Sequence, residues 1–192
     1  MPICHQFGCR SGDTLVSRTV RGTVEQGRLI SSTMAEQEQE SVIRVREALA
    51  AVGAPGQVRR LDDSARTAKE AADALGIVPA QIASSLIFMA DGEPVLVVAS
   101  GGHRVDTDKV AAILGVSEVG KATADDVRAA TSFAIGGVAP IGHPAPIRTI
   151  VDVDLGQYDE VWAAGGHPHY VFPTTFDELV RITGGTPADV GA

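Results

Sequence analysis

Residues 85–99 read SLIFMADGEPVLVVA and predict a β-hairpin. Two apolar runs, Ser85–Met89 and Val95–Ala99, flank the dipeptide Asp91-Gly92. Asp-Gly favours the positive φ angles of a tight two-residue hairpin turn, and the β-branched residues of the second run favour strands. We therefore predict two neighbouring antiparallel strands joined by this turn.

Helical patterns and further strands lie on both sides of the hairpin, and glycine follows several of the helical runs, as is common at helix ends. The predicted helices cover residues 42–52, 67–75, 106–114, 123–130 and a last one from Thr174 or Thr175 to Ile182, with Asp63 and Ser64 as candidate caps ahead of the second. Extended segments are predicted at 57–61, 147–151, 160–164 and 170–172. Several strands follow one another directly, which favours a mixed sheet over a doubly wound parallel one.

Composition limits the classes of function. The chain has 192 residues, 44% of them hydrophobic, and carries a formal net charge of −8. This charge argues against wide, non-specific binding of nucleic acid but leaves room for one RNA end in a pocket. No apolar run reaches the roughly 18 residues of a membrane span, and no signal peptide is evident at the N-terminus. The two cysteines offer no disulfide framework, so we expect a cytoplasmic protein.

Residues 1–33 differ from the remainder. Ser, Thr, Gly and Arg dominate there without helical or strand periodicity. Cys4, His5 and Cys9 are too few to make a metal site, which needs four ligands in a structural zinc centre. We expect residues 1–33 to be an extension, or the product of an upstream start codon, and residues 34–192 to form a single domain.

A loop rich in glycine and proline, Gly136–Gly142, is followed directly by His143-Pro144. Glycine allows a backbone to approach a ligand closely, and proline fixes the direction of the chain. Two interpretations are open. The loop is either a structural turn between a helix and a strand, or the wall of a site whose N–H groups hold a carbonyl or phosphate oxygen.

Familiar catalytic motifs are absent from the sequence: there is no G-x-S-x-G, P-loop, G-x-G-x-x-G or H-E-x-x-H. His167-Pro168-His169 follows Gly165-Gly166 between two predicted strands. The two histidines could be solvent-facing turn residues, metal ligands that still need a third partner, or hydrogen-bonding groups for a ligand held by the glycine loops.

The order of short motifs identifies a family resemblance over about two thirds of the chain, from Ser64 to Val190. The motifs are Gln81–Phe88, Asp91-Gly92, Asp106 and Lys109 before Leu114-Gly115, Gly136–Gly142, Asp152, Ala164-Gly165-Gly166, Phe176–Leu179 and Thr183-Gly184-Gly185. In this order and spacing, the chain resembles the YbaK/prolyl-tRNA synthetase-associated domain family, the free-standing aminoacyl-tRNA deacylases.

The resemblance implies an α/β (mixed α+β) fold with a strongly curved mixed sheet and surrounding helices. It also implies a metal-independent hydrolase without a cofactor, which cleaves the ester of tRNA mischarged with a small amino acid. Such an ester is already activated, so orienting its carbonyl and a water suffices. Editing is needed because one methylene gives a synthetase only about 1–3 kcal/mol of discrimination. The implied partners are the aminoacyl-tRNA 3′ end and a synthetase, with the protein a monomer or homodimer.

The same resemblance implies the site. Its predicted catalytic residues are His169 and Ser84, and its predicted substrate-binding residues are Ser85, Gly136, Gly137, Val138, Ala139, Pro140, Gly142, Asp152, Gly165, Gly166 and His167. Ser84 departs from the family, where a lysine is common. The sequence therefore predicts an altered specificity or, alternatively, a catalytically impaired binding module. Asp152 has a second interpretation, as a turn former at a strand end.

Overall fold

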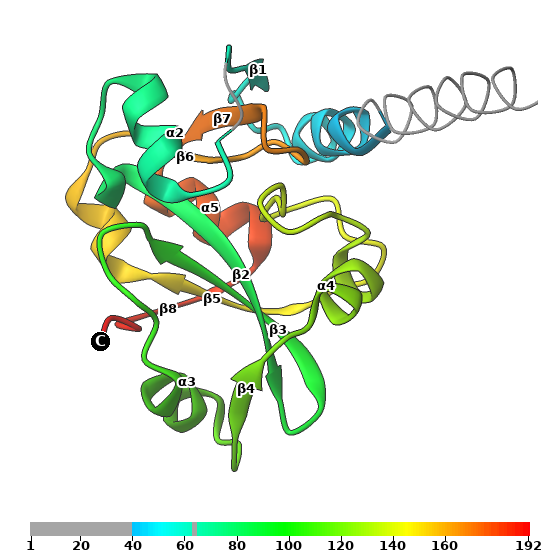
Figure 1. Ribbon diagram of the computed structural model, residues 1–192, viewed down its shortest axis with the longest axis vertical. Helices are drawn as coiled ribbons and strands as arrows, with labels where there is room; N and C mark the ends of the chain where they lie inside the picture. The colour runs from blue at the N-terminus through cyan, green and yellow to red at the C-terminus, as the bar shows by residue number, and fades with distance from the viewer. Residues whose placement is uncertain (1–39, 63–64) are drawn as a thin grey trace, which may run out of the picture. The chain divides into compact units, whose positions relative to one another are not determined.

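The protein is described by a computed structural model over residues 40–62 and 65–192 (Figure 1). The first element is a helix over residues 40–51, which agrees with the predicted helix. The predicted extension of residues 1–33, with Cys4, His5 and Cys9, lies outside the described residues, as do the candidate caps Asp63 and Ser64.

The predicted hairpin is confirmed and occupies the centre of the sheet. Strand β2 (Ile82–Ala90) pairs antiparallel with β3 (Glu93–Ser100), and the turn has φ angles of 48° at Asp91 and 90° at Gly92. Strand β2 starts three residues before the predicted Ser85, because Ile82 and Ala83 also pair with strand β6 (Val161–Ala164). A local pattern cannot reveal such a distant partner.

The sheet is mixed, as predicted. The described strands form an eight-stranded sheet in the order β1-β7-β6-β2-β3-β5-β8, with β4 paired to β2. Its remaining strands are β1 (Arg59–Arg60), β4 (Val119–Lys121), β5 (Arg148–Asp152), β7 (Tyr170–Thr174) and β8 (Thr186–Ala188). The pairs β3·β5, β5·β8 and β2·β6 are parallel, whereas the pairs β2·β3, β2·β4, β6·β7 and β1·β7 are antiparallel.

Helices begin and end at residues whose side chains or backbone suit a cap. The elements are α2 (Ala68–Leu75), α3 (Thr107–Leu114), α4 (Ala124–Thr131), α5 (Phe176–Thr183) and the 3-10 helices η1 (Pro79–Gln81) and η2 (Val153–Gln157). Glycines 76, 115 and 184 end α2, α3 and α5 in the left-handed conformation, as expected. The N-cap of α2 is Thr67, within a capping box that includes Glu70, rather than Asp63 or Ser64.

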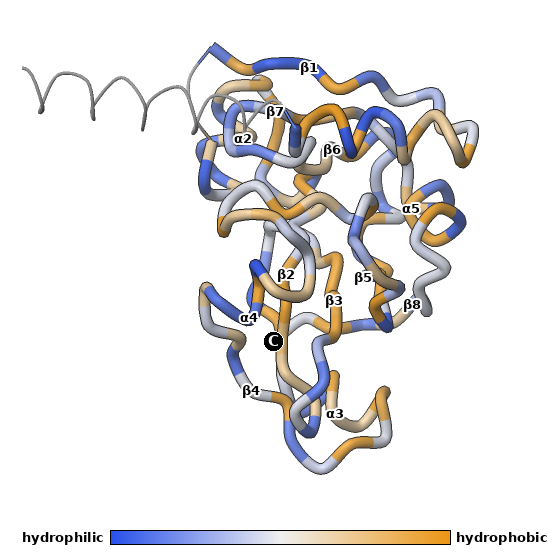
Figure 2. Tube along the Cα trace, turned by 90° about the vertical axis from the view of Figure 1, so that its right-hand side faces the viewer, coloured by the Kyte–Doolittle hydropathy of each residue, from blue (hydrophilic) through white to orange (hydrophobic). Residues whose placement is uncertain are grey.

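The apolar run of β3, whose place in the trace Figure 2 shows, separates two hydrophobic clusters. Leu96 and Val98 face the main cluster, which the helix 40–51 and α5 also join through Val45 and Leu179. Val97 and Ala99 face a second cluster with α3. A strand covered on both faces needs no polar alternation, which accounts for the continuous apolar run.

A third, smaller cluster lies beneath α2. Ala71 and Ala72 of this helix pack against Ile82 of β2 and Trp162 of β6. None of the helices in the described part of the chain has the length and apolar character required to cross a bilayer.

Candidate active site

A cavity of about 370 Å3 opens between β2, the start of α2 and the glycine-rich loop. Its walls are mainly apolar and small. They are formed by residues 65–68, 71, 82–87, 122, 127, 135, 136, 138, 162–164, 167, 170 and 171. The cavity therefore gathers segments that are more than 100 residues apart, from Ala65 to Val171.

Strand β2 presents an open edge to this cavity. On the side away from β3, Ile82 and Ala83 pair with β6 and residues 88–90 pair with β4. Within the described part of the chain, no strand pairs with residues 84–87 on that side. The carbonyl of Ile82 accepts from Gly101 on the β3 side, so strand alternation directs the main-chain N–H and C=O groups of Ser85 and Ile87 toward the gap. Such groups need a partner.

Ser84 and Ser85 project to opposite faces of the sheet, because side chains alternate along a strand. Ser85 shares its face with Ala83 and Ile87, which belong to the main cluster together with Val138 of the glycine-rich loop. Its Oγ is buried and has no hydrogen-bond partner among the described residues. A buried hydroxyl of this kind costs about 1–3 kcal/mol unless a ligand or water satisfies it. Ser85 is therefore suited to bind a polar group in the cavity.

The glycine-rich loop forms the opposite wall through two close approaches. Gly136 has a φ of +87°, and a β-carbon there would lie 3.5 Å from the Cα, Cβ and Cγ atoms of Arg66. At Gly137, a β-carbon would lie 2.7 Å from the Cα of His167, which is closer than real contacts allow. Glycine is thus required where the loop meets the turn between β6 and β7.

The rest of the loop lies behind this wall. Ala139 and Pro140 are buried and do not line the cavity. Gly142 packs instead against the helix 40–51, with Arg44 and Ala48 as its nearest neighbours. Of the predicted loop residues, Gly136 and Val138 line the cavity. Gly137 does not line it but contacts the backbone of His167, which does.

His143 is hydrogen-bonded to the backbone of the glycine-rich loop. Its Nε2 lies 2.9 Å from the carbonyl oxygen of Ala139, to which it donates. Burial lowers the pKa of His143, and the nearby Arg44 guanidinium also lowers it, against the opposing effect of the Ala139 hydrogen bond. The Arg44 guanidinium covers the Phe133 ring at 4.6 Å and donates to the Ser132 carbonyl at 3.0 Å. The sequence pattern predicted no role for His143 or Arg44.

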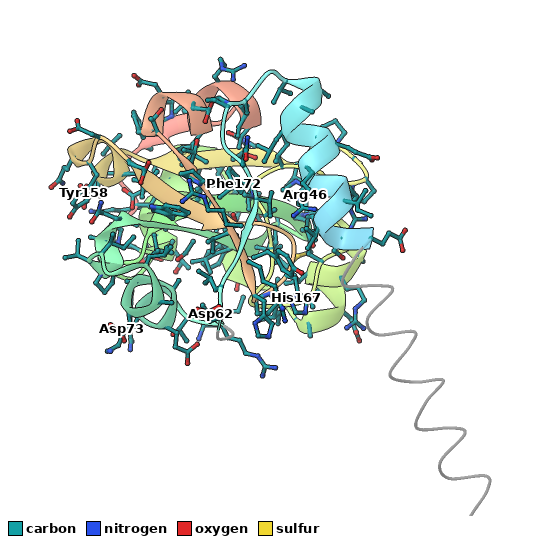
Figure 3. All side chains as sticks on the ribbon, turned by 90° about the horizontal axis from the view of Figure 1, so that it is seen from above. Arg46, Asp62, Asp73, Tyr158, His167 and Phe172 are labelled. Carbon is teal, nitrogen blue, oxygen red and sulfur yellow. The ribbon has the colours of Figure 1, made fainter. Side chains whose placement is uncertain are left out.

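The two predicted histidines lie at the turn between β6 and β7, and Figure 3 labels His167. His167 lines the cavity, whereas His169 does not. The backbone N–H of His169 donates to His167 Nδ1 at 3.3 Å, and the two rings stack at 5.5 Å. A neutral His167 then carries its proton on Nε2. No further described His, Cys, Asp or Glu completes a metal-ligand cluster with them.

Gly165 and Gly166 shape this turn without lining the cavity. Gly165 donates to the Tyr170 carbonyl at 2.7 Å, and Gly166 packs against Ser41 and Val45 of the helix 40–51. The same helix therefore contacts both the glycine-rich loop and the histidine turn.

Asp152 lies away from the cavity, at the end of β5. Its side chain is 0% exposed and accepts from the backbone N–H groups of Ser100 at 2.8 Å and Asp154 at 3.2 Å. His103 Nε2 lies 2.8 Å from its Oδ2. These contacts match the alternative interpretation of Asp152 as a strand-end residue that organises neighbouring turns.

Several cavity residues carry no recognisable signal in the sequence. Trp162 and Tyr170 sit among ordinary strand residues, and Ile135 is an exposed apolar side chain. Arg66 precedes the cap of α2 and resembles any surface arginine. Only the tertiary structure brings these residues together.

The family now follows from comparison with known sequences. The family profile of the aminoacyl-tRNA editing domain matches residues 62–182, which is more than half of the chain and includes every cavity-lining residue. The chain belongs to the aminoacyl-tRNA editing domain family. The resemblance inferred from the order of the motifs is thereby confirmed.

Relatives of this editing-domain protein include both free-standing proteins and parts of larger ones. A solved structure of a protein proposed to be a trans-editing enzyme for prolyl tRNA synthetase is 42% identical, with a TM-score of 0.75, and aligns over 79% of this chain and 97% of its own. The uncharacterized protein YwhH of Bacillus subtilis (strain 168) is 29% identical over 127 residues, 66% of this chain and 80% of YwhH.

Proline–tRNA ligase of Nitratidesulfovibrio vulgaris (strain DP4) is 31% identical over 120 residues, which make up 62% of this chain. The match spans 19% of the ligase, so the chain corresponds to about a fifth of that relative. The mixed α/β fold predicted from the sequence is shared with the solved structure described above.

Proposed function

We propose that this protein is a trans-editing deacylase, which hydrolyses the ester that joins a small, wrongly chosen amino acid to the 3′ end of a tRNA. Membership of the editing-domain family supports this function. The observation that carries it is the cavity itself: the open edge of β2 and the Ser85 hydroxyl, which has no partner among the described residues, face a mainly apolar pocket.

In the proposed reaction, the aminoacyl group enters between β2 and the glycine-rich loop. Main-chain N–H groups at Ser85 and Ile87 hold its carbonyl and favour the negative charge that develops there. Water attacks the carbonyl carbon, the ester C–O bond breaks, and the ribose oxygen leaves with a proton. Because the ester is activated, positioning supplies much of the required acceleration.

His167 is the group best placed to orient the water, since it lines the cavity. His169 supports it by donating its backbone N–H to His167 Nδ1, which holds the His167 ring in one orientation. His169, which the sequence predicted as catalytic, is therefore proposed to position the His167 ring, and His167 is proposed to contact the substrate. Ser84 contributes a neutral hydroxyl on the other face of β2.

The apolar lining of the pocket supports an amino acid with an apolar or weakly polar side chain. Ala83, Ala163 and Ala164 line the cavity together with Val138. An apolar pocket separates side chains that differ by one methylene by about 1–3 kcal/mol. Because relatives include proline–tRNA ligases, tRNA for proline is the first acceptor to examine. A synthetase partner follows from the same relationship.

The test is a deacylation assay with the full chain and proline tRNA charged with Ala, Ser, Thr or Cys, alongside correctly charged Pro-tRNA. We expect hydrolysis of at least one small mischarged substrate, sparing of Pro-tRNA, and no loss of activity with a chelator. Binding without turnover across the panel would overturn the enzyme assignment and support the binding module that Ser84 suggests. If the protein shows neither binding nor turnover with any member of the panel, both the enzyme and the binding module are overturned.

A further inference from the structure

Arg66 is the one lysine or arginine among the described residues that line the cavity. Its backbone N–H donates to the Glu70 carboxylate at 2.8 Å, next to a 3.2 Å bond from the N–H of Thr67. The capping box of α2 thus fixes the backbone that carries Arg66. The side chain belongs to an exposed residue, which places its charge at the cavity mouth.

The stem of Arg66 lies against the glycine-rich loop. Its Cα, Cβ and Cγ atoms all come within 3.5 Å of the position that a β-carbon on Gly136 would occupy. This spacing is an ordinary van der Waals contact, so the stem of Arg66 lies beside the loop at the edge of the cavity.

Arg66 also approaches the face of β2 that carries Ser84. Ile82 shares that face by strand alternation, and Ile82 packs with Ala65 and Ala71 in the cluster beneath α2. Segment 65–68 therefore covers the Ser84 face, on which Ser84 provides no charge. In a chain with a net charge of −8, a cation at the mouth favours the approach of an anionic ligand there.

We propose that Arg66 binds the 5′-phosphate of the terminal adenosine of the aminoacyl-tRNA; this assignment rests on the proposed function. The aminoacyl group reaches Ser85 and Val138 inside the cavity, while the nucleotide that carries it stays at the mouth. A guanidinium donates two parallel hydrogen bonds to a phosphate, so it supplies direction as well as charge.

The experiment uses two non-hydrolysable probes, 3′-alanylamino-3′-deoxyadenosine and its 5′-monophosphate, with dissociation constants measured by calorimetry on the full chain. We expect the wild type to bind the phosphorylated probe about tenfold more tightly or better, the range of a charge-assisted hydrogen bond. Arg66→Ala should abolish this preference and leave binding of the unphosphorylated probe unchanged. Arg66→Lys should retain part of it, because lysine is a point charge without the fork.

Lys69→Ala is the matched control. It removes a positive charge from the first turn of α2, three residues after Arg66, at an exposed residue that pairs with Asp73 and does not line the cavity, so the phosphate preference should persist. In the double variant Arg66→Ala/Ser84→Lys, a lysine on the covered face should restore part of the preference. Persistence of the full preference in Arg66→Ala would overturn the assignment, as would equal binding of both probes by the wild type. Failure of both probes to bind would instead overturn the proposed function and the assignment with it.

Discussion

Gly137 and His167 are in backbone contact, so close that a β-carbon on residue 137 would lie 2.7 Å from the Cα of His167 and 3.0 Å from its nitrogen. This contact joins the glycine-rich loop to the histidine turn. Gly136 and Val138 on one side and His167 on the other line the same cavity. The approach of two backbones therefore sets the spacing of the cavity walls.

Gly137→Ala should separate these walls. The new methyl group meets backbone atoms, which cannot rotate away, so we expect a loss of about 1–3 kcal/mol in the free energy of unfolding, together with a large loss of deacylase activity. Denaturant unfolding and the deacylation assay measure the two effects. Gly120→Ala in β4 is the control, because a β-carbon added there would meet no described atom within 4 Å other than those of its chain neighbours. Equal behaviour of the two variants would contradict the role of this contact.

Ser85→Ala should separate stability from activity. The Ser85 hydroxyl is buried without a partner among the described residues, so its removal should leave the free energy of unfolding unchanged or slightly higher. If the hydroxyl binds the substrate, kcat/KM should fall by about tenfold.

Ser100→Ala is the matched comparison for Ser85→Ala. The Ser100 hydroxyl donates to the Ala80 carbonyl at 2.9 Å and accepts from the N–H of Gly102 at 3.2 Å. Its loss should lower the free energy of unfolding by about 1 kcal/mol with little effect on kcat/KM. A stability loss in Ser85→Ala as large as that in Ser100→Ala would show that Ser85 is structural.

His143 should make stability depend on pH. Its pKa in the folded protein is lowered, mainly by burial, below the usual value of 6.5. Well above pH 6.5 the ring is neutral in both states and the Ala139 hydrogen bond is intact. As the pH falls below this value, the unfolded chain takes up a proton first, so the free energy of unfolding should decrease.

The variant His143→Gln isolates this effect. It should be less stable at pH 7.5, because the Ala139 carbonyl is held less well, but its stability should fall less between pH 7 and 5 than that of the wild type. Denaturant unfolding at a series of pH values gives both curves. Parallel curves would mean that folding does not lower the pKa of His143.

Local sequence signals predicted the elements that local chemistry determines. Asp91-Gly92 forms the predicted turn, and Gly115 ends the predicted helix, because each depends on its own backbone angles. The three-residue strands β4 and β8 were not predicted. Gly120 and Pro187 weaken their strand pattern, and both strands exist only through pairing with β2 and β5.

The site residues, too, were predicted only in part. Ser84, Ser85, Gly136, Val138 and His167 meet at the cavity, as the family resemblance implied, although their roles stay predictions. Arg66 was not predicted, because only tertiary packing distinguishes it from other exposed arginines. Gly142 has a structural reason to be glycine, its φ of +86° beside the helix 40–51, which is invisible in the sequence.

Asp152→Asn should destabilise the protein and leave the chemistry intact. Both carboxylate oxygens accept backbone N–H groups, from Ser100 and Asp154, so an amide NH2 in either place would face another donor. We expect a loss of about 1–3 kcal/mol in the free energy of unfolding.

Asp154→Asn is the control, since that side chain is 46% exposed and lies farther from His103, at 3.4 Å. This variant should lower the free energy of unfolding by less. At a temperature where Asp152→Asn remains folded, its kcat/KM for the edited substrate should equal that of the wild type. A folded variant with strongly reduced turnover would instead return Asp152 to the active site.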